Sequence, residues 1–584
     1  MAFSYIQPFQ YVALRLPSDA VRVEQILPNT IINLGKYGSF HTNQILGRPY
    51  HVTFEILDRS EGREGRELRI VPAAELHAVA LVEQAEIDEA STPTVANGET
   101  GSSTPAKSNV NIHDIRTNQK LTMSEIEALK QEELGSGRDL IEKIMQSHST
   151  LDQKTAFSLA KYSLRKHKKY MKWFTPLPLD IPTLTDWLME DRDPSKIMEM
   201  RNESLGLIGC WANIHFDGYD ANALPQMDPT CRYLVVDDTG GLVVAAMAER
   251  MGILHQTSLE KDPDQSAEDS PDDEAEAHEG SSPHKSAKPQ KPTPMSAKSN
   301  SITLIHANQQ PNLGLLRYFN YDANTPTQSH PLYTCLKTVS WLQLVDPESD
   351  MTYQEPEIMT AEELTKAKSN KRATYFRKRR RWERTKSVVD ETRAGGFNGL
   401  VVATSTDPVS ILSHLVPLLA GGSQIVVYSP HVEPLAELSD YYSTSRRTAF
   451  LNAPAEDRTV PSKDFPLDPT LVLPPMVQTS RVRKWQVLPG RTHPLMTGRG
   501  GAEGYVFTAT RVLPLEGKVE ARGRPPRNGK RQKVQESDTP QAEDDTSSLS
   551  KTSVVEAQGD QADSDVLMAE ASRDVEDTEI KTGD

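Results

Sequence analysis

The sequence predicts an α/β protein with an N-terminal β-rich domain, a helical segment, and a large C-terminal domain built on a mostly parallel sheet. Three observations support this prediction: short alternating apolar runs before residue 82, helix-start signals after residue 117, and apolar strands alternating with helical stretches after residue 205. The chain of 584 residues exceeds what one hydrophobic core usually organises, so two or three domains are expected.

The N-terminal domain, residues 1–89, is expected to be a small β-barrel or sandwich. Alternating apolar residues such as Val12, Leu14 and Leu16 favour strands, and Pro and Gly separate these runs. Residues 90–117 are rich in Ser, Thr, Pro and Gly, a composition typical of a linker.

Residues 118–204 are predicted to form a helical segment. Thr122 and Glu125 have the spacing of a capping box, in which each side chain bonds the backbone N–H of the other residue. Further helices are expected to begin near Gly137 and near Asp152.

The C-terminal domain is expected over residues 205–515. Its predicted strands lie at 233–236, 302–305, 400–403, 425–428 and 505–509, and their alternation with helices indicates a sheet covered on both faces. Residues 256–300 are rich in Asp, Glu, Ser, Pro and Lys and are predicted to be a disordered insertion. Residues 516–584 are predicted to be a disordered acidic tail.

The charge and cysteine content limit the class of protein. The net charge is −16, but residues 534–584 carry 15 acidic and 3 basic residues, so the rest of the chain is close to neutral. An acidic tail therefore does not argue against RNA binding elsewhere, because charges beyond a Debye length are screened. The three cysteines are widely spaced, and the sequence predicts no disulfide framework, no metal site and no membrane or secretory segment.

A stripe of cations follows one side of the helix expected after Asp152. At 100° per residue the stripe spans roughly 60°, and no carboxylate interrupts it; it consists of Lys154, Lys161, Arg165, Lys168 and Lys172, with Lys166 and Lys169 nearby. An unmixed stripe favours contact with RNA phosphates, and the alternative is a solvated helix face without a partner.

A second basic cluster lies in a long helical stretch over about residues 361–393. It contains Arg377, Lys378, Arg379, Arg380 and Arg381, preceded by Lys371-Arg372, and Tyr375, Phe376 and Trp382 interleave it. This mixture suits phosphate contacts combined with stacking, and the equal alternatives are a nuclear localisation signal or both roles in succession. For the basic run at 522–533 the localisation signal is the favoured interpretation.

Residues 231–243 have the order of a nucleotide-binding turn: an apolar strand, acidic residues, glycines and a helix. The acids are Asp237 and Asp238, and a spaced glycine motif is reduced to Gly240-Gly241 followed by bulky Leu242. In dinucleotide folds and class I methyltransferases this turn approaches the cofactor closely. The sequence therefore predicts a degenerate Rossmann-like methyltransferase domain in which this turn no longer binds a cofactor.

Two further positions support the loss of activity. The second strand of the sheet, at 302–305, is followed by His306, Ala307 and Asn308 instead of the carboxylate that would hold a ribose. After the strand at 400–403 the first acid is Asp407, which lies too late to be placed next to a target base. No catalytic residue is predicted.

Longer stretches closely resemble one known family. They include Asn29-Thr30-Ile31-Ile32-Asn33-Leu34-Gly35-Lys36-Tyr37-Gly38, Asn118-Gln119-Lys120-Leu121-Thr122, Arg165-Lys166-His167-Lys168-Lys169-Tyr170 and Tyr318-Phe319-Asn320-Tyr321. The chain resembles the non-catalytic subunit of the eukaryotic, fungal-type tRNA (adenine(58)-N(1))-methyltransferase, and the resemblance covers most of the chain outside the insertion and the tail.

The resemblance implies a nuclear heterotetramer of two such chains and two catalytic subunits. S-adenosylmethionine is then expected in the catalytic partner, while this chain would help to hold the tRNA during synthesis of 1-methyladenosine in the T-loop. Two other functions stay open at this stage: an RNA-associated scaffold or translation-initiation factor component, and an active S-adenosylmethionine-dependent methyltransferase.

Overall fold

The computed structural model describes residues 4–57, 66–72, 119–122, 124–126, 128, 137–149, 156–218, 231–255, 297–454, 456–483, 485–488, 491–494 and 501–513. All of these belong to one compact unit, residues 1–516, and the second unit, residues 517–584, lies outside the described residues. The predicted linker at 90–117, the acidic tail and most of the predicted insertion, 256–296, also lie outside them. Within the described residues no helix is long and apolar enough to cross a membrane.

An antiparallel sheet forms the N-terminal domain, in the order β2-β1-β7-β5-β6. Its strands are β1 (Tyr11–Arg15), β2 (Val21–Gln25), β5 (Phe54–Ile56), β6 (Leu68–Ile70) and β7 (Trp173–Pro178), and a separate hairpin pairs β3 (Ile31–Asn33) with β4 (Ser39–His41). Three aromatic rings stack in its core, with Phe174 lying 4.4 Å from Phe40 and 5.7 Å from Phe54 between ring centroids. The domain is β-rich as predicted, and its described strands form an open sheet with edges β2 and β6.

The central strand of this sheet comes from far along the sequence. Strand β7 pairs with β1 through Ala13 and Leu177, and with β5 through Phe54 and Phe174. The sequence placed residues 173–178 in the helical segment, because an isolated six-residue run gives no local sign of its distant partners. The N-terminal domain is therefore completed by a strand that follows the helices.

The helical segment contains the elements that local signals predicted. Thr122 and Glu125 form the capping box: the Thr122 N–H donates to the Glu125 carboxylate at 2.8 Å, and the Glu125 N–H donates to the Thr122 hydroxyl at 3.3 Å. Helix α3 (Gly137–Gln146) packs beside α4 (Ala156–Tyr170) through a small core that includes Ile144 and Met171. Helices α5 (Ile181–Glu190) and α6 (Asn202–Trp211) instead join the core of the next domain.

A seven-stranded sheet forms the C-terminal domain, in the order β10-β9-β8-β11-β12-β16-β13. The strands are β8 (Arg232–Asp237), β9 (Ser301–His306), β10 (Leu336–Ser340), β11 (Phe397–Ala403), β12 (Leu419–Ser429), β13 (Met476–Gln478) and β16 (Tyr505–Thr510). Strands β8 to β12 are parallel to one another, and β16 is antiparallel to both β12 and β13. This order, with one antiparallel strand inserted near the edge, is that of class I methyltransferases and confirms the predicted fold.

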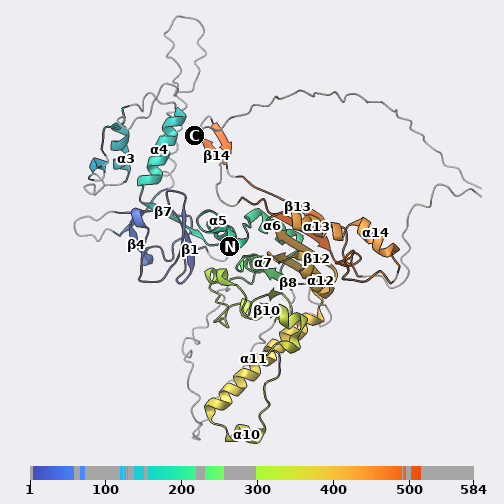
Figure 1. The fold of residues 1–584 in the computed structure, drawn as a ribbon. Helices are drawn as coiled ribbons and strands as arrows, with labels where there is room; N and C mark the ends of the chain where they lie inside the picture. The colour runs from blue at the N-terminus through green and yellow to red at the C-terminus, as the bar shows by residue number, and fades with distance from the viewer. Residues whose placement is uncertain are drawn as a thin grey trace, which may run out of the picture. The chain divides into compact units, whose positions relative to one another are not determined.

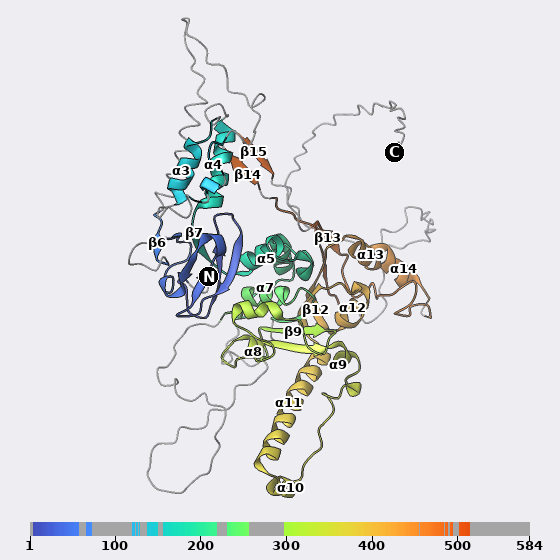
Figure 2. The same cartoon turned by 60° about the vertical axis from the view of Figure 1, so that its left-hand side comes forward.

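Helices cover both faces of this sheet (Figure 1). One core contains α5, α6 and α7 (Leu242–Arg250); the other contains α12 (Pro408–Leu415), α13 (Glu433–Tyr441) and the last turns of α11 (Ser369–Ala394). The other described α-helices are α8 (Leu332–Cys335), α9 (Trp341–Val345), α10 (Ala361–Lys366) and α14 (Thr444–Asn452), and a separate hairpin pairs β14 (Trp485–Leu488) with β15 (Arg491–Pro494). Figure 2 shows α10 at the end of α11 that lies away from the sheet.

Candidate nucleic-acid interface and nucleotide-site remnant

The glycine turn joins the end of β8 to the start of α7. Gly240 and Gly241 have φ angles of +75° and +94°, in the left-handed region that strongly favours glycine. The turn thus has the backbone shape expected of a nucleotide-binding loop, and its surroundings decide whether it can act as one.

Both acids of this turn are used within the fold. Asp237 is buried, and its carboxylate accepts hydrogen bonds from the N–H groups of Thr239 at 2.7 Å and Val244 at 3.1 Å. Burial raises the pKa of Asp237, and these hydrogen bonds act in the opposite direction. Asp238 accepts hydrogen bonds from the Thr404 hydroxyl and the Ser405 N–H, so it ties the end of β8 to the end of β11.

A segment that follows β9 covers the glycine turn. The Leu315 N–H donates to the Gly240 carbonyl at 3.0 Å, and a Cβ atom at Gly241 would lie 3.2 Å from the Cα of Leu313. Leu313 and Leu316 are buried in the same core as the first turn of α7. The chain therefore fills the contact surface of its own glycine turn with leucine side chains and backbone.

The residues that follow β9 and β11, where a working enzyme would place its ribose-binding and catalytic groups, have structural roles. His306 ends β9, and its Nδ1 lies 2.6 Å from the Asn308 carbonyl oxygen. Asp407 is the N-cap of α12, since its carboxylate accepts from the N–H groups of Val409 and Ser410, each at 3.2 Å. Helix capping therefore accounts for the position of the Asp407 carboxylate.

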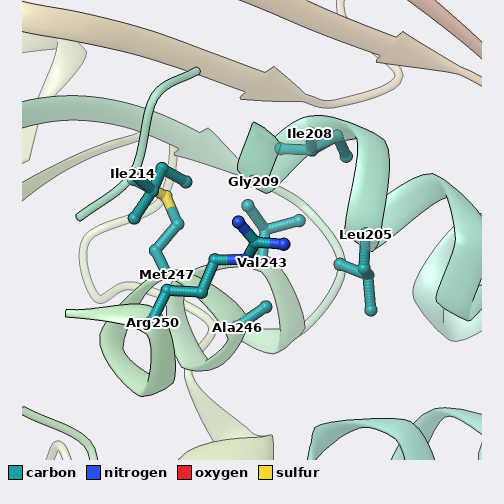
Figure 3. A pocket seen from close by; sticks show the side chains of 8 residues that line it. All are labelled: Leu205, Ile208, Gly209, Ile214, Val243, Ala246, Met247 and Arg250. Carbon is teal, nitrogen blue, oxygen red and sulfur yellow. The ribbon is translucent and has the colours of Figure 1, made fainter. Parts of the chain in front are cut away.

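A small pocket lies between α6 and α7, next to the core that includes the glycine turn (Figure 3). Its lining is apolar except for the Arg250 guanidinium, which would overlap a Cβ atom at Gly209. Its volume of about 10 Å³ holds roughly one water molecule. This pocket is therefore too small for a nucleotide or a nucleobase. Among the described residues, no group of His, Cys, Asp and Glu side chains is placed to hold a metal ion.

The basic stripe predicted on α4 is shorter than the sequence suggested. The helix ends at Tyr170, so Lys172 lies beyond it, while Lys154 and the side chain of Lys161 lie outside the described residues. Arg165 and Lys169 are exposed, in agreement with a surface role.

Two cations of this region have partners in the fold. Lys168 forms an ion pair with Asp19 in the β1–β2 turn, so a carboxylate distant in sequence interrupts the stripe. Lys166 is half-buried with its Nζ 4.8 Å from the centroid of the Tyr162 ring, and burial and the neighbouring Lys169 both lower its pKa. The expectation of a stripe without a carboxylate is therefore corrected.

Helix α11 carries the second basic cluster, and structure divides its cations between two faces. Residues 375, 379, 382 and 386 fall within about 60° of one another on the helix, and all four are half-buried. Arg379 on this face pairs with Glu355 at 3.8 Å and with Glu383 at 3.2 Å. The Trp382 indole N–H donates to the Tyr353 carbonyl at 2.9 Å.

The opposite face of α11 presents Arg377, Arg380 and Arg381, and Lys378 lies at its flank. All four side chains are exposed, and no ion pair involves them in the part of the chain that the structure describes. We call Arg377, Arg380 and Arg381 the basic face. Phe376, 45% exposed, lies on the same stretch of helix and offers a ring for stacking.

An acidic segment that sequence reasoning missed runs beside α11. Residues 346–360 contain five carboxylates and no Lys or Arg. Tyr353 and Glu355 bond Trp382 and Arg379 of the helix, and the Tyr353 hydroxyl donates to Asp390 at 2.7 Å. The run of acids was visible in the sequence, but only the fold pairs it with one side of the basic helix.

The chain matches known proteins over most of its length. Residues 5–368 match the model of the Gcd10p family. A protein of Aspergillus oryzae named "tRNA (adenine(58)-N(1))-methyltransferase non-catalytic subunit trm6" is 51% identical over 92% of this chain and 97% of its own length. A protein of Schizosaccharomyces pombe with the same name is 27% identical over 89% of this chain and 95% of its own.

Solved structures give only weak likenesses. The tRNA (m1A58) methyltransferase TrmI from Aquifex aeolicus aligns with a TM-score of 0.35 and 9% identity, covering 87% of this chain and 100% of that chain. The fold assignment therefore rests on the strand order described above. The family rests on the match over residues 5–368 and on the identity to full-length relatives, and by both measures this chain belongs to the Gcd10p family.

Proposed function

We propose that this chain is the non-catalytic, tRNA-binding subunit of a tRNA (adenine(58)-N(1))-methyltransferase. The observation that carries the proposal is the 51% identity, over 92% of the chain, to a relative that bears this name. The closed glycine turn supports the non-catalytic part, and the basic face of α11 supports the tRNA-binding part.

The residues at the glycine turn do not fit S-adenosylmethionine. Leu313 and Leu315 lie against Gly240 and Gly241, Asp237 is buried with its oxygens in internal hydrogen bonds, and no carboxylate follows β9. A bound cofactor would have to displace the buried Leu313 and the half-buried Leu315, and exposing a fully buried leucine to water costs about 1.5–3 kcal/mol. We therefore assign the cofactor and the methyl transfer to a catalytic partner subunit.

The work of this chain is then to bind and orient tRNA. Adenine N1 in folded tRNA is engaged in contacts, and exposing a base costs a few kcal/mol. Arginines that contact phosphates offset this cost without reading the sequence, because phosphate contacts fix register and orientation alone. A basic helix face that tracks a phosphate backbone suits this task.

The basic face of α11 is the first candidate for this contact. Arg377, Arg380 and Arg381, flanked by Lys378, point away from the acidic segment, whereas Arg379 faces it. On α4, Arg165 and Lys169 form a second, weaker candidate, because Lys168 is paired with Asp19 and Lys166 is partly buried. Lys154, Lys161 and Lys172 retain their predicted role as a proposal.

Assembly and location complete the proposal. We expect a heterotetramer of two such chains with two catalytic subunits, working in the nucleus. The basic sequence at 522–533 provides a candidate localisation signal.

The deciding experiment compares the chain alone with the chain plus its co-purifying methyltransferase partner. For the chain alone we expect no methyl transfer to tRNA and no heat of S-adenosylmethionine binding. For the mixture we expect methyl transfer and a measurable heat of binding. Turnover by the isolated chain, with contamination excluded, would overturn the non-catalytic assignment. Methylation by the partner alone at the rate of the mixture would overturn the tRNA-binding role.

A further inference from the structure

The inner end of α11 is attached to the sheet by a three-residue ion cluster. Glu391 lies in the last turns of the helix, Lys337 in β10 and Arg232 at the start of β8. The Lys337 Nζ lies 2.6 and 2.8 Å from the two Glu391 carboxylate oxygens, and one Arg232 nitrogen lies 3.2 Å from one of them. We call these three residues the anchor.

Removing one residue of the anchor is expected to destabilise the structure around it. The Lys337 side chain is only 3% exposed and that of Arg232 13% exposed, and burial lowers the pKa of Lys337 while Glu391 acts to raise it. Arg232 also donates to the Gly395 carbonyl at 3.3 Å and lies over the Phe397 ring. Removing one member of a buried ion pair leaves an uncompensated charge, which is strongly destabilising locally.

The two ends of α11 differ in how they are held. Near the anchor, Val388 and Val389 are buried in the sheet core, whereas the stretch before residue 382 is mostly exposed and contacts the acidic segment on one side only. Arg377 lies about 21 Å along the helix from Glu391, so a tilt of about 20° at the anchor would shift it by about 7 Å. That shift is about twice the 3.4 Å spacing of charges along one nucleic-acid strand.

From this geometry we propose that Glu391 is a positioning residue for RNA: by holding Lys337 and Arg232 it fixes the direction of the basic face, without contacting RNA itself. This inference rests on the proposed tRNA-binding role of α11. The proposal predicts that removing the Glu391 carboxylate weakens RNA binding. Charge alone predicts the opposite, because removing a carboxylate from a basic helix would strengthen RNA binding.

The test compares Glu391→Ala with Glu383→Ala in the complex of the full-length chain and its catalytic partner. Both variants remove one carboxylate from the same helix, but Glu383 is exposed and pairs only with Arg379 among the described residues. We expect Glu391→Ala to weaken tRNA binding about tenfold. This is the loss expected if the helix points in the productive direction for only about a tenth of the time. Glu383→Ala should strengthen binding slightly. The triple variant Arg232→Met, Lys337→Met and Glu391→Leu should recover binding to within about twofold, since apolar replacement of a whole buried ion cluster is often neutral.

A spin-label distance measurement isolates the positioning itself from RNA binding. Labels at Ala373→Cys and Ser413→Cys, both exposed, in a chain carrying Cys210→Ser, should give a broader distance distribution in Glu391→Ala than in Glu383→Ala. Unchanged distances together with unweakened tRNA binding in Glu391→Ala would overturn the proposal. If the distances broaden but replacing the three basic-face arginines leaves tRNA binding intact, the anchor stands and the proposed role of α11 in RNA binding fails.

Discussion

The glycine turn and the basic face of α11 belong to the same domain and have opposite physical characters. At the turn, the Asp237 carboxylate accepts hydrogen bonds from within the fold. The two glycines are covered by Leu313 and Leu315. On α11, Arg377, Arg380 and Arg381 remain exposed, whereas Arg379 pairs with Glu355 and Glu383. The difference teaches that a sequence motif alone does not show that a site is in use. Polar groups bonded within the fold are not available to a ligand, whereas exposed ones are.

The largest effect is expected from opening the covered turn. Leu313→Ala removes a buried side chain that lies against Gly241, and it should lower the free energy of unfolding by about 2–5 kcal/mol. Denaturant unfolding measures this loss. If S-adenosylmethionine restored the stability of the variant, the contrast between the two regions would fail. The glycine turn would then be a cofactor site that is closed but still able to bind.

Next in size is the loss of the basic face. The triple variant of Arg377, Arg380 and Arg381 to Ala should weaken binding of all tRNAs alike and lower the slope of log affinity against log salt by about 0.7–0.9 for each lost phosphate contact. Stability should change by less than about 0.5 kcal/mol per residue, because these side chains are exposed. Salt titrations, with Arg379→Ala as the paired control, decide it; a larger effect from Arg379 would reverse the assigned face.

Mild acid should affect the covered glycine turn and spare the basic face of α11. His330 is buried, its Nδ1 accepts from the Leu332 N–H at 3.2 Å and its Nε2 lies 3.2 Å from the Phe319 carbonyl, so it helps to hold the covering segment as a neutral ring. Burial lowers its pKa below the usual value, and burial also lowers the pKa of the adjacent His255.

The sign follows from this depressed pKa. The stability that depends on neutral His330 is present above the unfolded pKa of about 6.5 and is lost as the pH falls toward the folded value. Melting temperatures at pH 7.5 and 5.5 should therefore differ more in the wild type than in His330→Gln. An equal difference in both proteins would show that His330 does not cause the loss of stability in mild acid.

The smallest effect is expected on α4, and it tests whether a paired cation can still serve RNA. Asp19→Asn frees Lys168 from its ion pair and should strengthen tRNA binding by about twofold or less if α4 contacts RNA, since exposed pairs are worth about 0–1 kcal/mol. Lys169→Ala should weaken binding by a similar amount. Unchanged affinity in both variants would leave α11 as the RNA contact and α4 as a solvated helix.

Much of the fold was predictable because its signals are local. The five predicted strands of the sheet all lie within observed strands, the Thr122–Glu125 capping box forms as expected, and α3 begins at Gly137. Strands β10 and β13 were missed, because β10 is short and carries the charged Lys337 while β13 has three residues. Apolar periodicity and helix capping depend on neighbours within a few residues, which a single sequence displays.

The sequence by itself determined that the nucleotide turn is degenerate, that cations concentrate in two helices and that the chain resembles a non-catalytic methyltransferase subunit. Only the tertiary structure decided that Leu313 and Leu315 close the turn, that Asp19 pairs with Lys168, that β7 completes the first sheet, and that Glu391 holds Lys337 and Arg232. These contacts join residues that lie tens to more than a hundred positions apart. A side chain's charge and polarity are written in the sequence, but its partner and its burial follow from packing over the whole chain, which local patterns do not encode.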